Sequence, residues 1–155
     1  MTYEELLEDC RCLGIKVKEL NLRSSDGRVN GNRIAINKNL STTVEKKCVL
    51  IEELGHYLTT HGNILNQENI LNIKQELFAR KWAYEKLIPL ESLISAFELG
   101  LKTRFEISEY LNVTEEFLDN AINHYRIKYG TYRHVGKYII YFEPNLIIGK
   151  SFKQF

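Results

Sequence analysis

Apolar and polar positions alternate along this chain in two different periods. A helical period over residues 2–13 places one apolar side against the interior and ends before Gly14, which predicts an amphipathic helix. Residues 15–18 then alternate as a strand does, and residues 29–36 contain Asn30-Gly31, a pair that favours a tight turn between two strands. The N-terminal part is therefore predicted to be a helix followed by a small sheet.

A polar turn at 24–27 precedes this hairpin. The second arm of the hairpin, residues 33–37, reaches the next helical pattern within a few residues. We expect this strand to lie beside that helix. If the outer edge of the strand is unpaired, an extended peptide can add to it as a further strand. The alternative is an edge strand that binds no ligand.

The central helical pattern begins at Thr42-Thr43-Val44-Glu45, which has the form of a capping box. Its apolar stripe consists of Val44, Cys48, Ile51, Gly55 and Leu58. Glycine inside a helix costs roughly 1 kcal/mol relative to alanine, so Gly55 indicates that another element approaches closely. The pattern ends at His61-Gly62-Asn63.

Within this helix, Glu52-Glu53-Leu54-Gly55-His56 has the spacing of a zinc-protease helix, with Glu where the first His normally stands. Residues four apart lie on one face and can hold one metal ion, which makes Glu52 and His56 the candidate ligands. Glu53 then occupies the position of the general base. The alternative is that both glutamates are solvated and His56 is a half-buried packing residue.

A second helix is predicted over residues 67–88, ended by Pro89. Its expected buried stripe is Ile70, Ile73, Leu77, Tyr84 and Ile88. Glu76 lies in a column with apolar and small residues, where a carboxylate is costly unless it is paired or binds a metal. Glu76 is therefore the candidate third ligand of an open zinc site.

The stretches LIEELGHYL and QELFARKWAYEKLIP together resemble the two helices of the ImmA/IrrE family of metallo-endopeptidases. The resemblance covers roughly residues 15–130 and implies a zincin-like core with zinc as the cofactor. It places Glu52, His56 and Glu76 at the metal and Glu53 at the base. It also implies a protein substrate, a repressor of the Xre-like helix-turn-helix class, in phage, mobile-element or stress regulation.

The glutamate at position 52 departs from the family pattern and leaves three alternatives open. Glu52 can itself bind zinc, since carboxylates are zinc ligands, although the ion is then less Lewis acidic. His61 can take the vacant ligand position, although its spacing from His56 is not that of a helical His pair. Finally, the protein can have lost zinc and kept only a binding surface.

Residues 91–129 are predicted to be helical, with a capping box at 103–106 and a helix-turn-helix outline over 103–128. Residues 91–130 include four Lys or Arg and seven Asp or Glu, whereas a DNA-binding helix-turn-helix requires a basic face. A helical part that completes the core or holds the substrate fits better. Residues 132–142 are predicted to form a hairpin, followed by a loose basic tail from Gly149.

The composition adds limits to this interpretation. The chain has 155 residues, 44% of them hydrophobic, and a formal net charge of +1, so bulk charge favours neither nucleic acid nor membrane as a partner. The three cysteines and the lack of a long apolar run are typical of a cytoplasmic protein.

The sequence therefore predicts a single α+β domain over 1–155, with a metal-site core at 1–89, a helical subdomain at 90–130 and a C-terminal hairpin and tail at 131–155. The predicted activity is a zinc-dependent endopeptidase. The competing hypotheses are an inactive homologue that binds the repressor without cleavage and a DNA-binding regulator.

Overall fold

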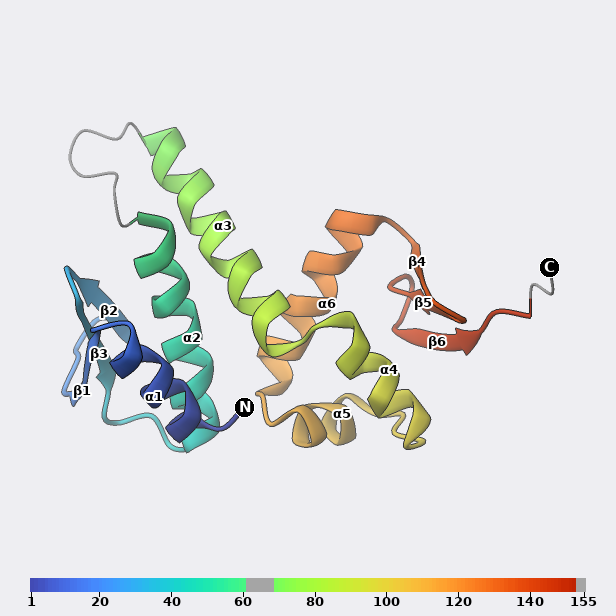
Figure 1. Ribbon diagram of the computed structural model, residues 1–155, viewed down its shortest axis with the longest axis horizontal. Coiled ribbons are helices and arrows are strands. Elements are labelled where there is room, and N and C mark those ends of the chain that lie inside the picture. Colours follow the sequence, from blue (N-terminus) through green and yellow to red (C-terminus); the bar gives the residue numbers. More distant parts are fainter. Residues whose placement is uncertain (61–68, 153–155) are drawn as a thin grey trace. The chain divides into compact units, whose positions relative to one another are not determined.

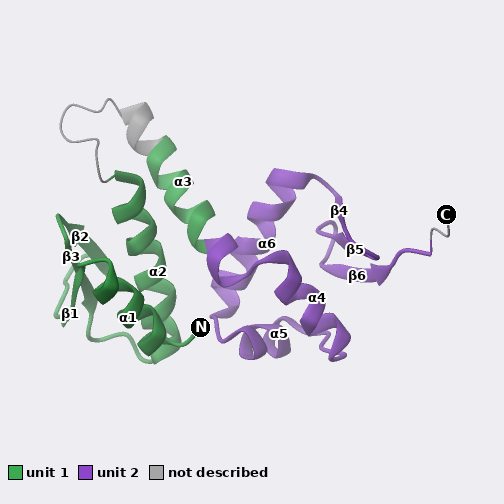
Figure 2. Ribbon diagram, in the orientation of Figure 1, with its two compact units in different colours: residues 1–83 green, residues 84–155 purple. Residues whose placement is uncertain are grey.

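A computed structural model describes residues 1–60 and 69–152, and of residues 69–73 it describes the backbone alone. Within these ranges the chain forms six helices and two three-stranded sheets (Figure 1). The fold is therefore α+β, as predicted. Two compact units can be separated, residues 1–83 and 84–155 (Figure 2), and each is described by itself. The predicted single domain and its internal boundaries stay a prediction.

The sheet of the first unit has the strand order β1-β3-β2, with β1 (Lys16–Leu20) parallel and β2 (Gly27–Asn30) antiparallel to β3 (Arg33–Asn37). The hairpin is confirmed, although its two turn residues are Gly31 and Asn32 rather than Asn30 and Gly31. The condition for adding a peptide at residues 33–37, an unpaired outer edge, is not met, because β1 pairs with the other side of β3. The edge strands are β1 and β2.

The core of this unit lies between the sheet and the helices α1 (Tyr3–Cys12) and α2 (Thr43–Thr60), which Figure 1 shows beside the sheet. Ile34 and Ile36 of β3 point toward it and are buried. The capping box at the start of α2 is confirmed: Thr42 Oγ1 accepts a hydrogen bond from the Glu45 backbone N–H at 3.1 Å, and the Glu45 carboxylate accepts one from the Thr42 N–H at 3.2 Å. The cap fixes where α2 begins and hence which residues face the sheet.

Helix α3 (Asn69–Leu87) packs closely against α2 at Gly55, as the sequence indicated. A Cβ atom on Gly55 would lie 2.6 Å from the Ala79 carbonyl oxygen. Ala79 and Ala83 are fully buried, whereas Leu77, predicted to be buried, is 52% exposed. The close approach turns the alanine side of α3 toward α2, which moves Leu77 out of the core. The side chains of Ile70 and Ile73 lie outside the described residues.

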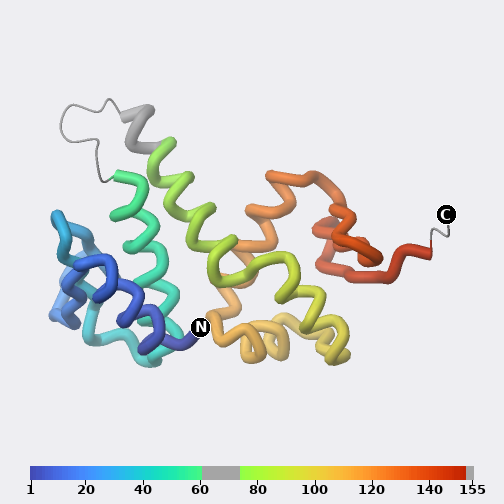
Figure 3. The backbone as a smooth tube through the Cα atoms, viewed as in Figure 1, coloured from blue at the N-terminus to red at the C-terminus, as the bar shows by residue number. Residues whose placement is uncertain are grey.

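The second unit contains α4 (Leu90–Glu98), α5 (Arg104–Leu111) and α6 (Glu115–Tyr129), which can be followed in the tube of Figure 3. The predicted capping box at Thr103 and Glu106 is confirmed, and Asn112 in the left-handed conformation (φ 54°) ends α5. The helix-turn-helix outline is therefore present.

The C-terminal sheet is wholly antiparallel and has the order β4-β5-β6. Strands β4 (Tyr132–Val135) and β5 (Tyr138–Tyr141) form the predicted hairpin. The predicted loose tail does not begin at Gly149, because Gly149 lies in β6 (Ile147–Lys150) opposite Ile139 of β5. Residues 153–155 of the predicted tail lie outside the described residues. No helix in the described part of the chain is both long and apolar enough to cross a membrane.

Candidate metal centre and active site

Two of the predicted ligands meet between the facing helices α2 and α3. His56 Nε2 lies 3.2 Å from Glu76 Oε2, and both side chains are partly exposed. They are 20 positions apart in the sequence, so their meeting depends on the packing of α3 against α2 at Gly55. The imidazole and the carboxylate therefore share one accessible place on this unit.

The geometry of this pair suits a shared zinc ion. Two ligand atoms that each lie about 2.0–2.1 Å from a tetrahedral zinc ion are roughly 3.3 Å apart, close to the observed separation of His56 and Glu76. One nitrogen and one carboxylate oxygen are also the donor types that zinc accepts. The residues present thus fit the metal.

Glu52 stands one helical turn before His56 on α2 and is partly buried. Within residues 1–60 and 69–152, however, no three His, Cys, Asp or Glu side chains are grouped as a ready-made metal site. The structure thus brings His56 and Glu76 together, and the place of Glu52 as a third donor stays a prediction. His61, the predicted substitute, lies outside the described residues.

The predicted base, Glu53, lies against β2. A Cβ atom on Gly27 would be 2.6 Å from Glu53 Cγ and 2.8 Å from Glu53 Oε1, so the carboxylate lies directly against the strand backbone. Burial raises the pKa of Glu53 to about 7, and the negative charges of Glu52 and Glu76 add to the rise. A carboxyl group with such a pKa can take up and release a proton near neutral pH.

Arg80 completes the surroundings of Glu76. Its Nε donates to Glu76 Oε1 at 2.8 Å, which leaves Oε2 to face His56. Arg80 follows Glu76 by four residues on the same helix, a spacing at which side chains of opposite charge meet. Arg80 therefore orients the carboxylate, a role that the sequence analysis did not assign to it.

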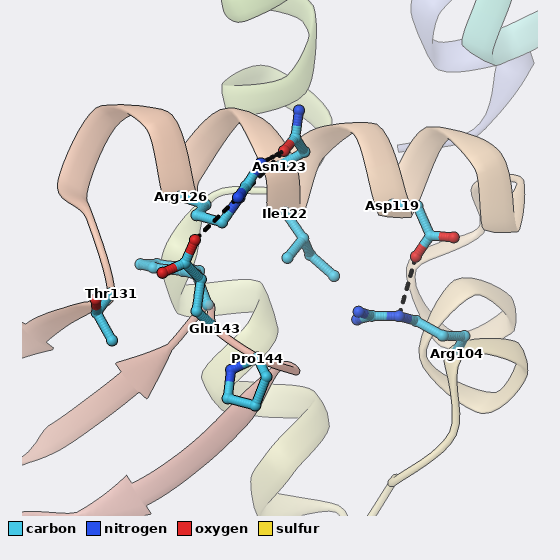
Figure 4. A pocket seen from close by; sticks show the side chains of 9 residues that line it. Arg104, Asp119, Ile122, Asn123, Arg126, Thr131, Glu143 and Pro144 are labelled. Atoms are coloured by element: carbon cyan, nitrogen blue, oxygen red, sulfur yellow. Dashed lines mark hydrogen bonds and ion pairs between the residues drawn. The ribbon is translucent and has the colours of Figure 1, made fainter.

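The second unit has a separate hollow of about 700 Å³, shown in Figure 4. Its two arginines are both held by carboxylates: Arg104 pairs with Asp119 at 3.0 Å and Arg126 with Glu143 at 2.9 Å. His124 is buried beside Glu85, with 2.9 Å between His124 Nε2 and Glu85 Oε1. Each of these three contacts pairs a cationic or imidazole side chain with a carboxylate inside the second unit.

Comparison with known proteins decides the family. The family model described as the IrrE N-terminal-like domain, peptidase M78, matches residues 10–123. The chain belongs to the peptidase M78 family. No curated protein and no solved structure matches it.

Membership in the M78 family implies a metallopeptidase and a metal ion, and it confirms the resemblance inferred from the two helical stretches. The matched residues include α2 and α3 with their candidate ligands, and end within α6. The sheet β4–β6 lies beyond the match. The M78 assignment therefore covers the candidate site and leaves the C-terminal sheet without a comparison.

Proposed function

We propose that this M78 protein is a zinc-dependent endopeptidase, with Glu52, His56 and Glu76 holding the ion and Glu53 acting as the general base. The observation that carries the proposal is the 3.2 Å approach of His56 Nε2 to Glu76 Oε2 from two facing helices. The residue between the two α2 ligands, Glu53, supplies the proton acceptor that peptide hydrolysis needs.

A zinc ion held by these residues would supply Lewis acidity to the scissile carbonyl and to the attacking water. Glu53 would take a proton from the water and pass it to the leaving amine, so that the carboxylate would end the cycle in its starting state. Burial against β2 raises the pKa of Glu53, which makes its carboxylate a better proton acceptor than an exposed one. Arg80 keeps Glu76 turned toward His56.

The substrate peptide binds as an added strand along the outer edge of β2. This strand is at the edge of its sheet, and its Gly27 touches Glu53. A peptide paired with β2 passes the base at a fixed distance, held by backbone hydrogen bonds that do not depend on its sequence. The strand proposed to pair with the substrate is therefore β2, and not residues 33–37 of β3, which form the central strand of the sheet.

The proposed substrate is a repressor of the Xre-like helix-turn-helix class, and the setting is the regulation of a mobile element, phage or stress response. Support for this comes from the family resemblance of the two site helices and not from a contact in the structure. The carboxylate at position 52 makes the ion less Lewis acidic than a second histidine would. Cleavage is accordingly expected to be slow.

The test begins with metal content, measured by elemental analysis on untagged protein prepared without chelator. We expect near-stoichiometric zinc in the wild type and a loss in His56→Ala and in Glu76→Ala. Glu53→Gln should keep the zinc and lower repressor cleavage by about 10²-fold or more, because it removes the base and no ligand. Cleavage at the wild-type rate by Glu53→Gln would contradict the mechanism.

An alternative function is repressor binding without cleavage, and the observation that favours it is Glu52 itself. Wild-type protein that takes up no zinc, even when zinc is added, would support this alternative. A DNA-binding role for α5 and α6 is the weaker candidate, because the first turn of α6 carries Glu115 and Glu116. Salt-sensitive binding to duplex DNA that is lost on substitution in α6 would support it.

A further inference from the structure

The N-terminal sheet has a second face, opposite the one that carries Ile34 and Ile36. Side chains alternate along a strand, so Arg33 and Ala35 of β3 point to this second face. Their register partners lie beside them: Lys16 pairs with Arg33, and Ala35 lies between Lys18 and Arg28. We refer to Lys16, Lys18, Arg28 and Arg33 as the basic face.

The basic face is not neutralised by ion pairs with the described residues. All four cations are exposed, and none forms an ion pair with a described residue. The one acidic residue within the three strands, Glu19, points to the other face, where it bonds Tyr3 and Lys46. Four positive charges therefore gather on one small surface of a chain whose formal net charge is only +1.

A hollow of about 400 Å³ lies on this surface. It is lined by Lys16, Lys18, Leu20, Arg33, Ile34 and Ala35. The short side chain of Ala35 leaves room between its long neighbours, and Leu20 is 47% exposed at the end of β1. Lysine and arginine stems are aliphatic below their charged ends, so the hollow has an apolar floor and a cationic rim.

We propose that the basic face is a docking surface for an acidic segment of a partner protein, in which an apolar side chain enters the hollow and flanking carboxylates meet the rim. Charge complementarity indicates that the bound segment of the partner carries negative charge. The apolar floor indicates that the partner is a protein, because protein interfaces commonly place an apolar anchor residue at the centre and polar residues at the rim. This inference does not depend on the metal site.

Nucleic acid fits the same surface less well. Sequence-independent binding of single strands uses aromatic side chains on which bases stack, and none of the strand residues of this face is aromatic. A duplex offers regularly spaced phosphates but nothing apolar for the hollow. Duplex DNA is therefore a competitor in the test and not the proposed partner.

The test measures binding of the full chain to a fluorescent peptide in which Glu and Leu alternate, by anisotropy at low salt. We expect Lys18→Glu combined with Arg33→Glu to weaken binding by about tenfold or more, since two attractions become repulsions. The matched control reverses two exposed cations of α3, Lys81→Glu with Lys86→Glu, and should change the affinity less than about twofold. Added salt should weaken wild-type binding.

The apolar anchor has its own variant. Leu20→Ser should weaken binding of the Glu-Leu peptide and leave the weaker binding of a Glu-Ser peptide unchanged. Absence of peptide binding, or equal losses in the basic-face and control variants, would overturn the proposal. Tighter binding of a duplex DNA than of the peptide, or self-association that the Lys18, Arg33 double variant abolishes, would assign the face to nucleic acid or to a second copy and overturn it as well.

Discussion

Glu76 divides its two carboxylate oxygens between two partners, Arg80 at 2.8 Å and His56 at 3.2 Å. One oxygen is thereby fixed by a guanidinium, and the other is presented to the place where the metal is proposed to bind. Residues that orient a ligand in this way commonly change metal affinity by 10–100-fold when they are removed. The ion pair is thus a test of the site that leaves the proposed ligands themselves unchanged.

We expect Arg80→Gln to lower zinc affinity by about tenfold, because Glu76 loses the contact that orients it. The measurement is a zinc titration against a competing chelator. Lys81→Gln is the matched control, since it removes a positive charge from the neighbouring exposed position of α3. If both variants lost the same affinity, the effect of Arg80 would be one of general charge and not of orientation.

Gly27 is the second residue that bears on the site, because its missing side chain is what lets Glu53 lie against β2. A methyl group at this position would come within 2.6 Å of Glu53 Cγ and 2.7 Å of Val49 Cγ1. We expect Gly27→Ala to displace the Glu53 carboxylate and lower the cleavage rate by about tenfold or more, while zinc content is retained.

Gly149→Ala is the control for this variant, since Gly149 is also a strand glycine and nothing lies within 4 Å of the position its Cβ would take. It should cleave at the wild-type rate. A Gly27→Ala protein that loses its zinc along with its activity would show that the strand supports the metal and not only the base.

Among the elements, α2 and α3 depend on each other at Gly55. Alanine there would improve the helix propensity of α2 by roughly 1 kcal/mol, but its methyl group would lie 2.6 Å from the Ala79 carbonyl oxygen. Backbone cannot move aside as a side chain can, and overpacking typically costs about 1–3 kcal/mol. The cost exceeds the gain, and the two helices must separate.

Gly55→Ala is therefore expected to lower the free energy of unfolding by about 1 kcal/mol in denaturant titrations. The same variant should bind zinc less tightly, because His56 and Glu76 are carried by the two separated helices. Lys81→Ala, at an exposed position of α3, gives the reference for a helix substitution without a clash. Greater stability in Gly55→Ala than in the wild type would show that propensity outweighs the close approach.

The elements that the sequence predicted well are those fixed by neighbouring residues. Both capping boxes depend on a side chain and a backbone group three positions apart, and the hairpins on a turn between adjacent strands. Whether residues 33–37 have a free outer edge, which the sequence left open, depends on a partner farther away in sequence. That β1 pairs with β3, across the intervening β2, is decided by contacts that no local pattern contains.

The residues of the candidate site can likewise be divided into those that a local sequence pattern predicts and those that only the fold brings together. The helical spacing of Glu52, Glu53 and His56 is local, and Glu76 was found because two helical motifs resemble one family. The four-residue spacing of Glu76 and Arg80 was also visible in the sequence. Nothing local connects Gly27 with Glu53, because that contact exists only once β2 lies against α2.

At the scale of the whole chain, Glu85 should make the stability of the second unit depend on pH. In the second unit Glu85 accepts hydrogen bonds from Lys128 and His124. Burial alone would raise the pKa of Glu85, but the hydrogen bonds from Lys128 and His124, together with the charge interactions of these two residues, outweigh burial and lower it. A carboxyl whose pKa is lower in the folded state stabilises that state above its ordinary pKa and loses this effect as the pH falls through the folded value.

We expect Glu85→Gln to unfold at a lower temperature than the wild type near neutral pH. The difference should shrink as the pH falls below the ordinary value of 4.5, where the unfolded chain takes up the proton first. It should be lost once the pH is also below the lowered pKa of the folded state, because Glu85 is then protonated in both states of the wild type. Thermal unfolding followed by circular dichroism across this range measures it. A difference that does not change with pH would mean that Glu85 acts through packing and not through its charge.

The basic face also affects how the molecule behaves as a particle in solution. The formal net charge is +1, yet four cations that form no ion pair with the described residues occupy one side of a single small sheet. An ion-exchange resin interacts with the charged patch that faces it and not with the net charge of the protein. Salt screens charges that lie more than about 10 Å from the resin. During purification the chain should therefore be retained on a cation exchanger even where titration finds it nearly neutral.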